Sequence, residues 1–449
     1  MFRGLASRPV RAVFDEPDTT SDGGALLLKA ADERLGLTRA WAACLEDPRD
    51  PDRVSHSLHD LLRQRIYGLA LGYEDANDAA RIGDDPMHRL LLDRDPLTGA
   101  TLASQPTLSR FENGVDRRAL VALGERFADT VLDRLRARRK SRAPRLITID
   151  LDPTCDPTHG HQQLSFFHGF YDTHCYLPML GFLTLDDEKE SYLVAAVLRP
   201  GRAPDKQGAI GILRRVIGKV RVRFPHARIR VRLDAGFKAP EVLAFLDAAG
   251  VEYVVGYANN ERLAQECVGW AEEAERHFAR SGHPVQVFGE LHYVGRQWKG
   301  RSRRLIVKAE VVESPGREPK VNLRFVVTNL RHQPSNVYAI YRWRGDVENR
   351  VKELKDGVAL DRTSCSDFYA NQLRVLLAAA AYAILQELRT RLRGTELARA
   401  QVHRLRLCLL RIGARIEASV RRIVIHLAAA HGWQPPWTRV AAALGATRC

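Results

Sequence analysis

Two aspartates and one glutamate occupy positions from which they could serve a single active site. Asp152 follows a short apolar, β-branched stretch at residues 146–151, and Asp234 ends a similar stretch at residues 229–233. Buried strands of an α/β domain deliver side chains to a common edge of the sheet, so these two carboxylates are expected to lie near one another. Glu348 lies in a segment with helical periodicity and is the third acid of the predicted set.

The segment around Glu348 brings further chemical groups to one helix face. Glu353 is about 140° from Glu348 on a helical wheel and is expected to point elsewhere. A tyrosine, an arginine and a lysine, by contrast, share an arc of roughly 60° with Glu348. Charged residues at this spacing often form only a solvent-exposed ion pair, but the tyrosine on the same face and the acids upstream favour a site. The shared face consists of Tyr341, Arg344, Glu348 and Lys355.

These side chains suit metal-dependent phosphoryl transfer. Hard divalent cations such as Mg²⁺ take oxygen ligands and keep positions open for phosphate oxygens. Two ions about 3.5–4 Å apart can activate a water or a 3′-hydroxyl and stabilise the leaving oxygen. Asp152, Asp234 and Glu348 are therefore the predicted catalytic and metal-binding residues, with Mg²⁺ as the expected cofactor and Mn²⁺ as a substitute. The residues predicted to hold a DNA phosphate beside them are Tyr341, Arg344 and Lys355.

The charge of the chain favours a polyanionic partner. The sequence has 69 Lys and Arg against 54 Asp and Glu, a formal net charge of +15. Because phosphates dominate the affinity of proteins for nucleic acid, we expect double-stranded DNA as the partner. No membrane segment is expected, since the apolar run at residues 376–385 is shorter than the roughly 20 residues a bilayer requires. Seven cysteines without a Cys-x-x-Cys pair indicate a reduced, cytoplasmic protein.

Apolar patterns divide the chain into helical ends and a mixed α/β middle. Residues 1–140 have the pattern of a helical bundle, and residues 393–449 that of basic helices. Between them, short β-branched stretches alternate with helices, which indicates an α/β domain with a mixed sheet. Expected strands cover residues 146–152, 176–185, 192–198, 229–234, 253–255, 287–294, 303–312 and 323–328. Expected helices beyond residue 140 cover residues 204–223, 239–249, 337–355, 368–392 and 398–430.

The motifs resemble those of the DDE transposases of bacterial insertion sequences. The spacing Tyr-x2-Arg-x3-Glu-x6-Lys is similar to that group's signature, and it is met from Tyr341 to Lys355. Residues 152–154 (Asp-Pro-Thr) are similar to the segment that holds the group's first catalytic acid. Residues 234–237 (Asp-Ala-Gly-Phe) are similar to the segment that holds the second. Three further stretches resemble one subgroup, the insertion-sequence 1380 family: residues 72–78, 104–110 and 160–163.

This resemblance implies an RNase H-like α/β catalytic core with a β-rich insertion, flanked by α-helical N- and C-terminal regions. It implies cut-and-paste transposition, by end cleavage and strand transfer, on the terminal inverted repeats of an element and on target DNA. It also implies a homodimer in the synaptic complex and a nucleoid-associated location in the bacterial cytoplasm. The implied domains are a DNA-binding region at 1–140, the core at 141–258 and 321–392, the insertion at 259–320 and a basic region at 393–449.

Some positions keep more than one interpretation. Asp150 lies two residues before Asp152 on the same side of the strand, so it is the alternative first acid. In related enzymes that form DNA hairpins, an aromatic residue of the insertion stacks on a flipped base. Trp298 is the candidate for that role, or else it packs on a small sheet. Cysteines and histidines crowd around His161 and Gln162, which would suit a zinc site, but their spacing fits no closed zinc module. We therefore expect His161 and Gln162 to support the site or to contact DNA.

Two other functions use the same residues. A metal-dependent nuclease would cut DNA without joining it, and a catalytically inactive descendant of a transposase would only bind DNA as a regulator. The presence of all three acids favours an active transposase. Joining of a 3′-hydroxyl end to target DNA would separate a transposase from a nuclease.

Overall fold

The computed structural model describes residues 7–8, 10–139, 142–295, 298, 300–314 and 317–447. The chain forms two compact units: one combines Met1–Gly114 with Ala380–Cys449, and the other is Val115–Ala379. This division differs from the predicted one, which places residues 115–140 in the N-terminal region and residues 380–392 in the core. Lys140 and Ser141, on which the predicted boundary falls, lie outside the described residues.

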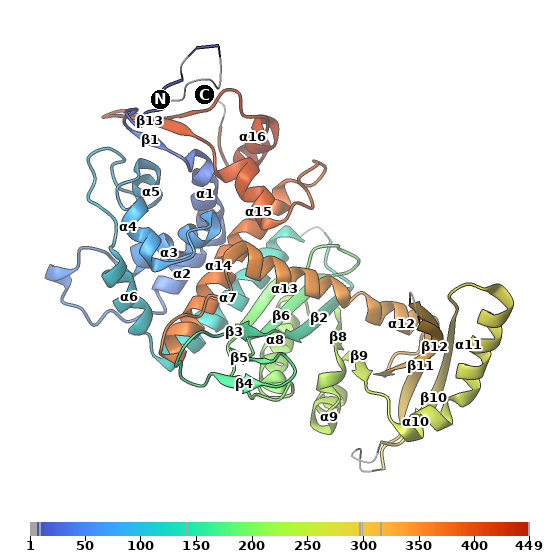
Figure 1. Cartoon of the computed structure of the whole chain (residues 1–449). Coiled ribbons are helices and arrows are strands. Elements are labelled where there is room, and N and C mark those ends of the chain that lie inside the picture. Colours follow the sequence, from blue (N-terminus) through green and yellow to red (C-terminus); the bar gives the residue numbers. More distant parts are fainter. Residues whose placement is uncertain are drawn as a thin grey trace. The chain divides into compact units, whose positions relative to one another are not determined.

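The larger unit is built on one mixed, eight-stranded sheet (Figure 1). Its central strands are parallel, since β2 pairs with β8 and β8 pairs with β9. The other pairings are antiparallel. The predicted mixed α/β sheet is confirmed. In spatial order the strands are β10 (Gln286–Tyr293), β11 (Arg303–Ser314), β12 (Arg317–Thr328), β9 (Glu252–Tyr257), β8 (Arg228–Leu233), β2 (Leu146–Pro153), β6 (Met179–Leu185) and β7 (Tyr192–Val197).

Helices α8 (Ala209–Arg223) and α9 (Pro240–Ala248) connect β7 to β8 and β8 to β9. Their buried residues recur at helical spacing, so each helix turns one apolar stripe toward the core. Helix α7 (Arg117–Arg138) packs against both β7 and α8. The residues before Gly114 belong to the other unit, so α7 is the first helix of the larger one.

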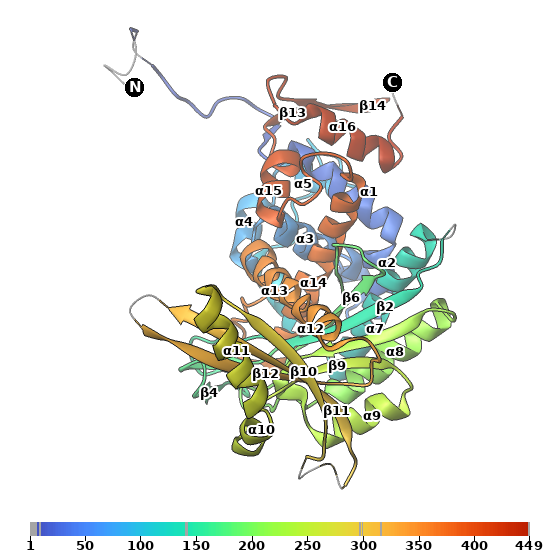
Figure 2. The same cartoon turned by 90° about the vertical axis from the view of Figure 1, so that its right-hand side faces the viewer.

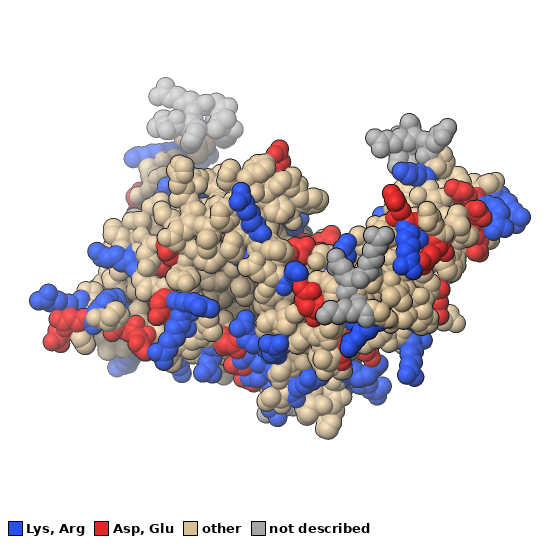
Figure 3. Space-filling view, turned by 90° about the horizontal axis from the view of Figure 1, so that it is seen from below, with Lys and Arg blue, Asp and Glu red and all other residues tan. Residues whose placement is uncertain are grey.

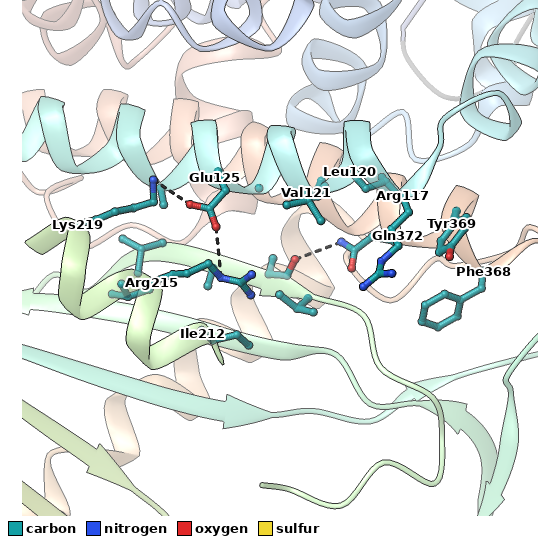
Figure 4. A pocket seen from close by; sticks show the side chains of 18 residues that line it. Arg117, Leu120, Val121, Glu125, Ile212, Arg215, Lys219, Phe368, Tyr369 and Gln372 are labelled. Carbon is teal, nitrogen blue, oxygen red and sulfur yellow. Dashed lines mark hydrogen bonds and ion pairs between the residues drawn. The ribbon is translucent and has the colours of Figure 1, made fainter. Parts of the chain in front are cut away.

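An apolar cavity of about 190 Å³ lies where α7, β7, α8 and the first turns of α14 (Phe368–Arg391) meet (Figure 4). Glu125 at its edge forms ion pairs with Lys219 at 2.9 Å and with Arg215 at 3.3 Å. The Gln372 side chain hydrogen bonds to the backbone of the chain at β7, which satisfies polar groups at the edge of the sheet. None of the three predicted acids is among the described residues that line this cavity.

Strands β10, β11 and β12 continue the main sheet, because β12 pairs with β9. The predicted insertion boundary at residue 320 therefore falls inside a strand. Side chains alternate between the two faces: Ile306 packs under α12 (Pro334–Arg342), and Ala309 packs under α11 (Val268–Ser281). Figure 2 shows α11 lying across these strands. Helix α10 (Glu261–Glu266) precedes it, so the segment contains helices as well as strands.

A small sheet interrupts the chain between β2 and β6. Its strands lie in the order β3 (Asp156–Pro157), β5 (Thr173–Tyr176) and β4 (Phe166–His168), and all pairings are antiparallel. Because β2 and β6 pair directly with each other, with Asp152 opposite Leu180, the small sheet starts and ends at the end of β2 that carries Asp152.

The segment predicted as one helix at residues 337–355 is two helices. Helix α12 ends at Arg342, and α13 (Gly345–Val358) begins three residues later. The prediction of a continuous helix is wrong, and the poor helix propensity of Gly345 explains a break at this point. The linking residues Trp343 and Arg344 nevertheless keep right-handed helical dihedral angles. The side chains before and after the break therefore keep nearly helical spacing.

The smaller unit joins both ends of the chain. Strands β13 (Ala414–Ser419) and β14 (Arg422–Leu427) form a hairpin, and β13 also pairs with β1 (Thr19–Thr20). The prediction of a helix at residues 398–430 is wrong there, since burial along β13 alternates with a period of two. The helices of this unit are α1 (Leu26–Leu35), α2 (Leu37–Ala42), α3 (Leu58–Leu71), α4 (Ala79–Ile82), α5 (Pro86–Leu91), α6 (Gln105–Asn113), α15 (Val402–Leu405) and α16 (Gln434–Ala443).

Helix α14 is long and apolar enough to cross a bilayer by length and composition alone. However, 78% of its most apolar stretch is buried in the protein. This burial is typical of the core helix of a globular protein, which is apolar on all sides because it is covered on all sides.

The close approach of Gly24 to the C-terminal segment gives a test of the smaller unit. A Cβ at Gly24 would lie 1.9 Å from the carbonyl oxygen of Leu409. We expect Gly24→Ala to lower the free energy of unfolding by about 1–3 kcal/mol, measured by urea denaturation. The control is Gly413→Ala, whose Cβ would meet no atom within 4 Å. Equal stability of the two variants would contradict this packing.

Candidate active site

The sequence of β2 separates an apolar face from a polar one. Ile147, Ile149 and Leu151 are completely buried on one side of the strand, and Asp150 and Asp152 alternate with them on the other. Asp150 is 0% exposed, whereas Asp152, next to the end of the strand, is 8% exposed. The strand thus presents two carboxyl groups on one face at different depths.

Strand β8 delivers the second acid. Arg230 and Arg232 alternate with apolar residues along the strand, and Asp234 follows directly after it. The Oδ1 atom of Asp234 accepts a hydrogen bond of 2.8 Å from the backbone N–H of Gly236, which caps a short 3-10 turn at Ala235–Phe237. This bond fixes the carboxylate so that its other oxygen, Oδ2, faces Arg344.

The guanidinium of Arg344 contacts the three predicted acids. Its Nη2 lies 2.7 Å from Oδ1 of Asp152 and 3.4 Å from Oδ2 of Asp234, and its Nη1 lies 3.3 Å from Oε1 of Glu348. The side chain of Asp152 is 11% exposed, that of Asp234 is 29% and that of Glu348 is 66%. The structure therefore brings together side chains from β2, from the end of β8 and from α13, arranged from the interior to the solvent.

The closeness of the three acids affects the pKa values of Asp152 and of Arg344. Burial raises the pKa of Asp152 to about 6; Arg344 opposes this rise, and Asp234 and Glu348 add to it. Burial disfavours the charged guanidinium of Arg344, yet Asp152 and Asp234 hold its pKa above the usual value. The charge of Asp152 is thus unfavourable in this site, and the Arg344 guanidinium lowers that cost.

The choice between Asp150 and Asp152 has a structural basis. Both oxygens of Asp150 accept hydrogen bonds of 2.8 Å from Arg232, which lies opposite it in the parallel register of β2 and β8. Arg232 also donates to the carbonyl oxygen of Ile340 in α12, at 3.2 Å. Both oxygens of Asp150 are therefore occupied by Arg232, and this pair links β2, β8 and α12. Of the two, Asp152 is the one that contacts Arg344.

Tyr341 lies beside Asp234, and burial raises its pKa. Its hydroxyl would be 2.6 Å from a Cβ at Gly256 in β9, and the same Cβ would be 2.7 Å from the backbone nitrogen of Ala235. Only glycine at position 256 leaves room for both the tyrosine and the Asp234 turn. The helix-face prediction thus places Tyr341 correctly next to the acids, despite the break between α12 and α13.

Lys355 and Glu353 take different directions, as the helical wheel predicts. Lys355 donates a hydrogen bond to the carbonyl oxygen of Cys155, three residues after Asp152. Glu353 is buried and forms an ion pair of 3.2 Å with Arg350. Lys355 is thus near the predicted site, but in this structure its ammonium is bonded to the protein backbone.

Trp298 does not lie at the surface, as a residue that receives a flipped base would. It is only 5% exposed, and its ring packs edge-on against Tyr257 at 5.3 Å and Tyr293 at 5.8 Å between ring centroids. The guanidinium of Arg303 lies 5.8 Å from the same ring. Of the two interpretations for Trp298, packing against a sheet fits this burial, because aromatic neighbours on β9 and β10 cover the ring. Its stacking on a flipped base stays a prediction.

The segment around His161 is attached to the chain that follows α13. The amide nitrogen of Gln162 donates to the carbonyl oxygens of Thr363 at 2.6 Å and Cys365 at 3.1 Å. His161 lies exposed beside it. Of the two interpretations for Gln162, support of the local structure fits these contacts, and contact of His161 with DNA stays a prediction.

Sequence reasoning missed two residues near the acids. The half-buried Asp205 lies so close to the Asp234 turn that a Cβ at Gly236 would be 2.0 Å from its Oδ2. Burial, together with the charge of Asp234, raises the pKa of Asp205. Burial raises the pKa of Tyr171, between β4 and β5, and the charges of Cys155, Asp205 and Asp152 add to this rise. Neither residue stands in an apolar strand pattern, so only the fold brings them here.

Within the described residues, no group of three or more His, Cys, Asp or Glu side chains is spaced so that it could already hold a metal ion. The donor set is nevertheless appropriate, because three carboxylates supply the oxygen ligands that Mg²⁺ and Mn²⁺ prefer. The cation now in contact with them is the Arg344 guanidinium. A metal ion would require this side chain to move away.

Charge on the visible surface is mixed. Figure 3 shows Lys and Arg side chains spread over one face and interspersed with Asp and Glu, without one continuous basic patch. The formal net charge of +15 is thus not concentrated on this face. Long-range attraction of a polyanion remains expected from the total.

A family model described as "Transposase DDE domain group 1" matches residues 2–449. The chain therefore belongs to the DDE transposases. No curated protein matches the sequence significantly. Membership of this family supports a transposase that binds DNA and a DNA-cleaving and joining enzyme, and domains of this kind generally use divalent metals. It also agrees with the mixed α/β sheet described above.

Stability measurements can separate the two acids of β2. We expect Asp150→Asn to lower the free energy of unfolding by about 3–5 kcal/mol, because it leaves Arg232 buried with an incomplete partner. Asp152→Asn should leave stability unchanged or raise it at pH 7.5. At pH 7.5, above its pKa of about 6, Asp152 is ionised in the folded protein, and burial makes that charge unfavourable. Asparagine carries no charge and removes this cost. Urea denaturation of both variants measures this, and a reversed order would refute the assignment.

Proposed function

We propose that this transposase cuts the ends of an insertion sequence and joins them to target DNA at a site formed by Asp152, Asp234 and Glu348. The observation that carries the proposal is the convergence of these three carboxylates, from three separate elements, on one guanidinium. An ion pair at the surface needs only one acid per arginine. Three acids around one cation, at the end of a sheet, support a site for divalent cations and phosphate.

The sheet supports an RNase H-like core. Three strands, β2, β6 and β7, are antiparallel, and β8 and β9 extend them in parallel from β2. The first acid lies near the end of the central strand β2, the second follows β8, and the third lies on α13, after the last strand of the sheet. The resemblance to the Tyr-Arg-Glu-Lys signature and to the insertion-sequence 1380 family is part of this proposal.

Mg²⁺, or Mn²⁺ in its place, bound by Asp152, Asp234 and Glu348 would supply charge neutralisation at the phosphate and a more acidic attacking water or 3′-hydroxyl. The contribution of Arg344 is different: once released by the acids, its guanidinium can bind a DNA phosphate bidentately. Tyr341, held against Gly256, would donate a hydrogen bond to the same strand. Catalysis would depend on positioning and on charge, as in phosphoryl transfer generally.

The wider biology follows from cut-and-paste transposition. The partners would be double-stranded DNA with the terminal inverted repeats of the element, target DNA and a second copy of the chain in the synaptic complex. The location would be the bacterial cytoplasm, in association with the nucleoid. The N-terminal helices, which include α6 with Gln105 and Arg110, are the proposed DNA-binding region.

Cleavage of DNA that carries the element's end, in Mg²⁺, tests the proposal. We expect wild type to cut at the end and to join the 3′-hydroxyl to target DNA. We expect Glu348→Gln to bind equally but to cut roughly a thousandfold more slowly, because several kcal/mol of stabilisation are lost. Asp356→Asn, an exposed acid later in α13, is the control. Cutting without joining would indicate a nuclease, and binding without cutting would indicate a regulator.

Arg344 yields a second test, because it competes with metal ions for the same acids. We expect Arg344→Ala to bind Mn²⁺ about tenfold more tightly in the absence of DNA, as measured by electron paramagnetic resonance. The same variant should cut DNA more slowly, since it lacks the phosphate contact. Weaker Mn²⁺ binding by Arg344→Ala would show instead that the arginine organises the acids for the metal.

A further inference from the structure

The Gly-His-Gln-Gln stretch at residues 160–163 binds the chain that follows α13. This α13–α14 link, residues 359–367, joins the helix of Glu348 to α14. The side-chain nitrogen Nε2 of Gln162 donates to two carbonyl oxygens of the link, that of Thr363 at 2.6 Å and that of Cys365 at 3.1 Å. A side-chain amide has two N–H groups, so one glutamine can serve both carbonyls.

Gln163 and Asp156 add to this attachment. The backbone N–H of Gln163 donates to the carbonyl oxygen of Ser366 at 3.0 Å, and its side-chain oxygen accepts from the backbone N–H of Phe368 at 3.2 Å. The hydroxyl of Thr363 donates to Oδ2 of Asp156 at 2.8 Å. Because Asp156 is 0% exposed and Thr363 is 3% exposed, water does not compete for this bond. The α13–α14 link is therefore attached to the segment of the small sheet at several points.

The attached segment begins at the first of the predicted acids. Cys155 and Asp156 lie three and four residues after Asp152. Lys355, in the last turn of α13, donates to the carbonyl oxygen of Cys155, and α13 also packs against β2. The chain that leaves Asp152 is thus bonded both to the helix that carries Glu348 and to the α13–α14 link.

These bonds determine where Glu348 lies once a metal ion binds. Within the described part of the chain, Arg344 is the residue that connects Glu348 with Asp152 and Asp234. A metal ion at the three acids would displace this guanidinium. The distance between Glu348 and Asp152 would then depend on bonds that do not involve Arg344, and metal ligands must be held within about 0.5 Å of their places.

We propose that Gln162 is a positioning residue for the metal site. By holding the α13–α14 link against the small sheet, it keeps α13, and with it Glu348, at the distance from Asp152 that a shared divalent ion requires. The inference rests on the proposed function and adds to it a residue that lies outside the acids. Residues that orient the ligands of a metal ion commonly change the metal affinity by about 10- to 100-fold when they are replaced.

The experiment measures Mn²⁺ binding to the full-length protein without DNA, by electron paramagnetic resonance. We expect Gln162→Glu to bind Mn²⁺ about tenfold more weakly than wild type, because glutamate has the shape of glutamine but no N–H to donate. Gln162→Lys, whose ammonium can still donate to both carbonyl oxygens, should bind within about threefold of wild type. Gln265→Glu, the same change at an exposed position of α10, is the control and should bind like wild type.

The two variants of Gln162 separate positioning from charge. An added negative charge by itself would strengthen Mn²⁺ binding, and an added positive charge would weaken it. The expected order, with Gln162→Lys binding more tightly than Gln162→Glu, is the reverse of this. Urea denaturation shows whether Gln162→Glu is folded. If it is not, Gln162→Ala, which removes both bonds without adding a charge, takes its place.

Cleavage in Mg²⁺ completes the test. Gln162→Glu should need about tenfold more Mg²⁺ than wild type for half-maximal cleavage and should reach a maximal rate within about threefold of wild type. Equal Mn²⁺ affinity of wild type and Gln162→Glu would overturn the inference and leave the proposed function standing, and weaker DNA binding alone would assign Gln162 to DNA contact instead. Mn²⁺ binding that persists in Asp152→Asn would overturn the proposed function, and the inference with it.

Discussion

Three carboxylates that lie close together repel one another, and a cation among them lowers this repulsion. Arg344 supplies this cation: one guanidinium contacts Asp152, Asp234 and Glu348. Burial and the neighbouring acids raise the pKa of Asp152 to about 6, which measures how unfavourable its charge is. The same crowding lowers the stability of the fold and attracts a divalent ion. The charges that oppose folding are therefore the ones that the proposed function requires.

A second layer beneath the site determines where these acids lie. Asp150 and Arg232 form a bidentate pair between β2 and β8, and Arg232 also bonds to the backbone of α12. A buried pair of this kind contributes little net stability but is costly to break, so it favours one register of the two strands over others. Gly256 allows the turn of Asp234 and the ring of Tyr341 to approach β9. The geometry of the site is thus specified by residues that do not themselves face the solvent.

The sequence predicted the strands well, because β2 and β8 bear short apolar runs that end in acids. It also predicted the neighbourhood of Tyr341, Arg344 and Glu348, since the backbone stays helical at Arg344 although the helix breaks there. The sequence prediction failed where contacts with other segments of the chain determine the local structure. The arginine-rich segment after Ala414 forms a hairpin through its pairing with β1. Trp298 is covered by Tyr293, five residues before it, and by Tyr257, which β9 brings there from a distant part of the sequence. Asp205 reaches the site from the turn before α8, at a position that the sequence predicts to be helical.

Iron-directed cleavage of the protein backbone can show whether Asp152, Asp234 and Glu348 share a bound metal ion. Fe²⁺ in place of Mg²⁺, with ascorbate and peroxide, generates hydroxyl radicals that cut the polypeptide next to the bound ion. If the three acids share a metal ion, cuts should appear near residues 152, 234 and 348 together, should be suppressed by excess Mg²⁺ and should be absent from the Asp152→Asn variant. Cuts at other positions, or cuts that persist in that variant, would contradict a shared ion.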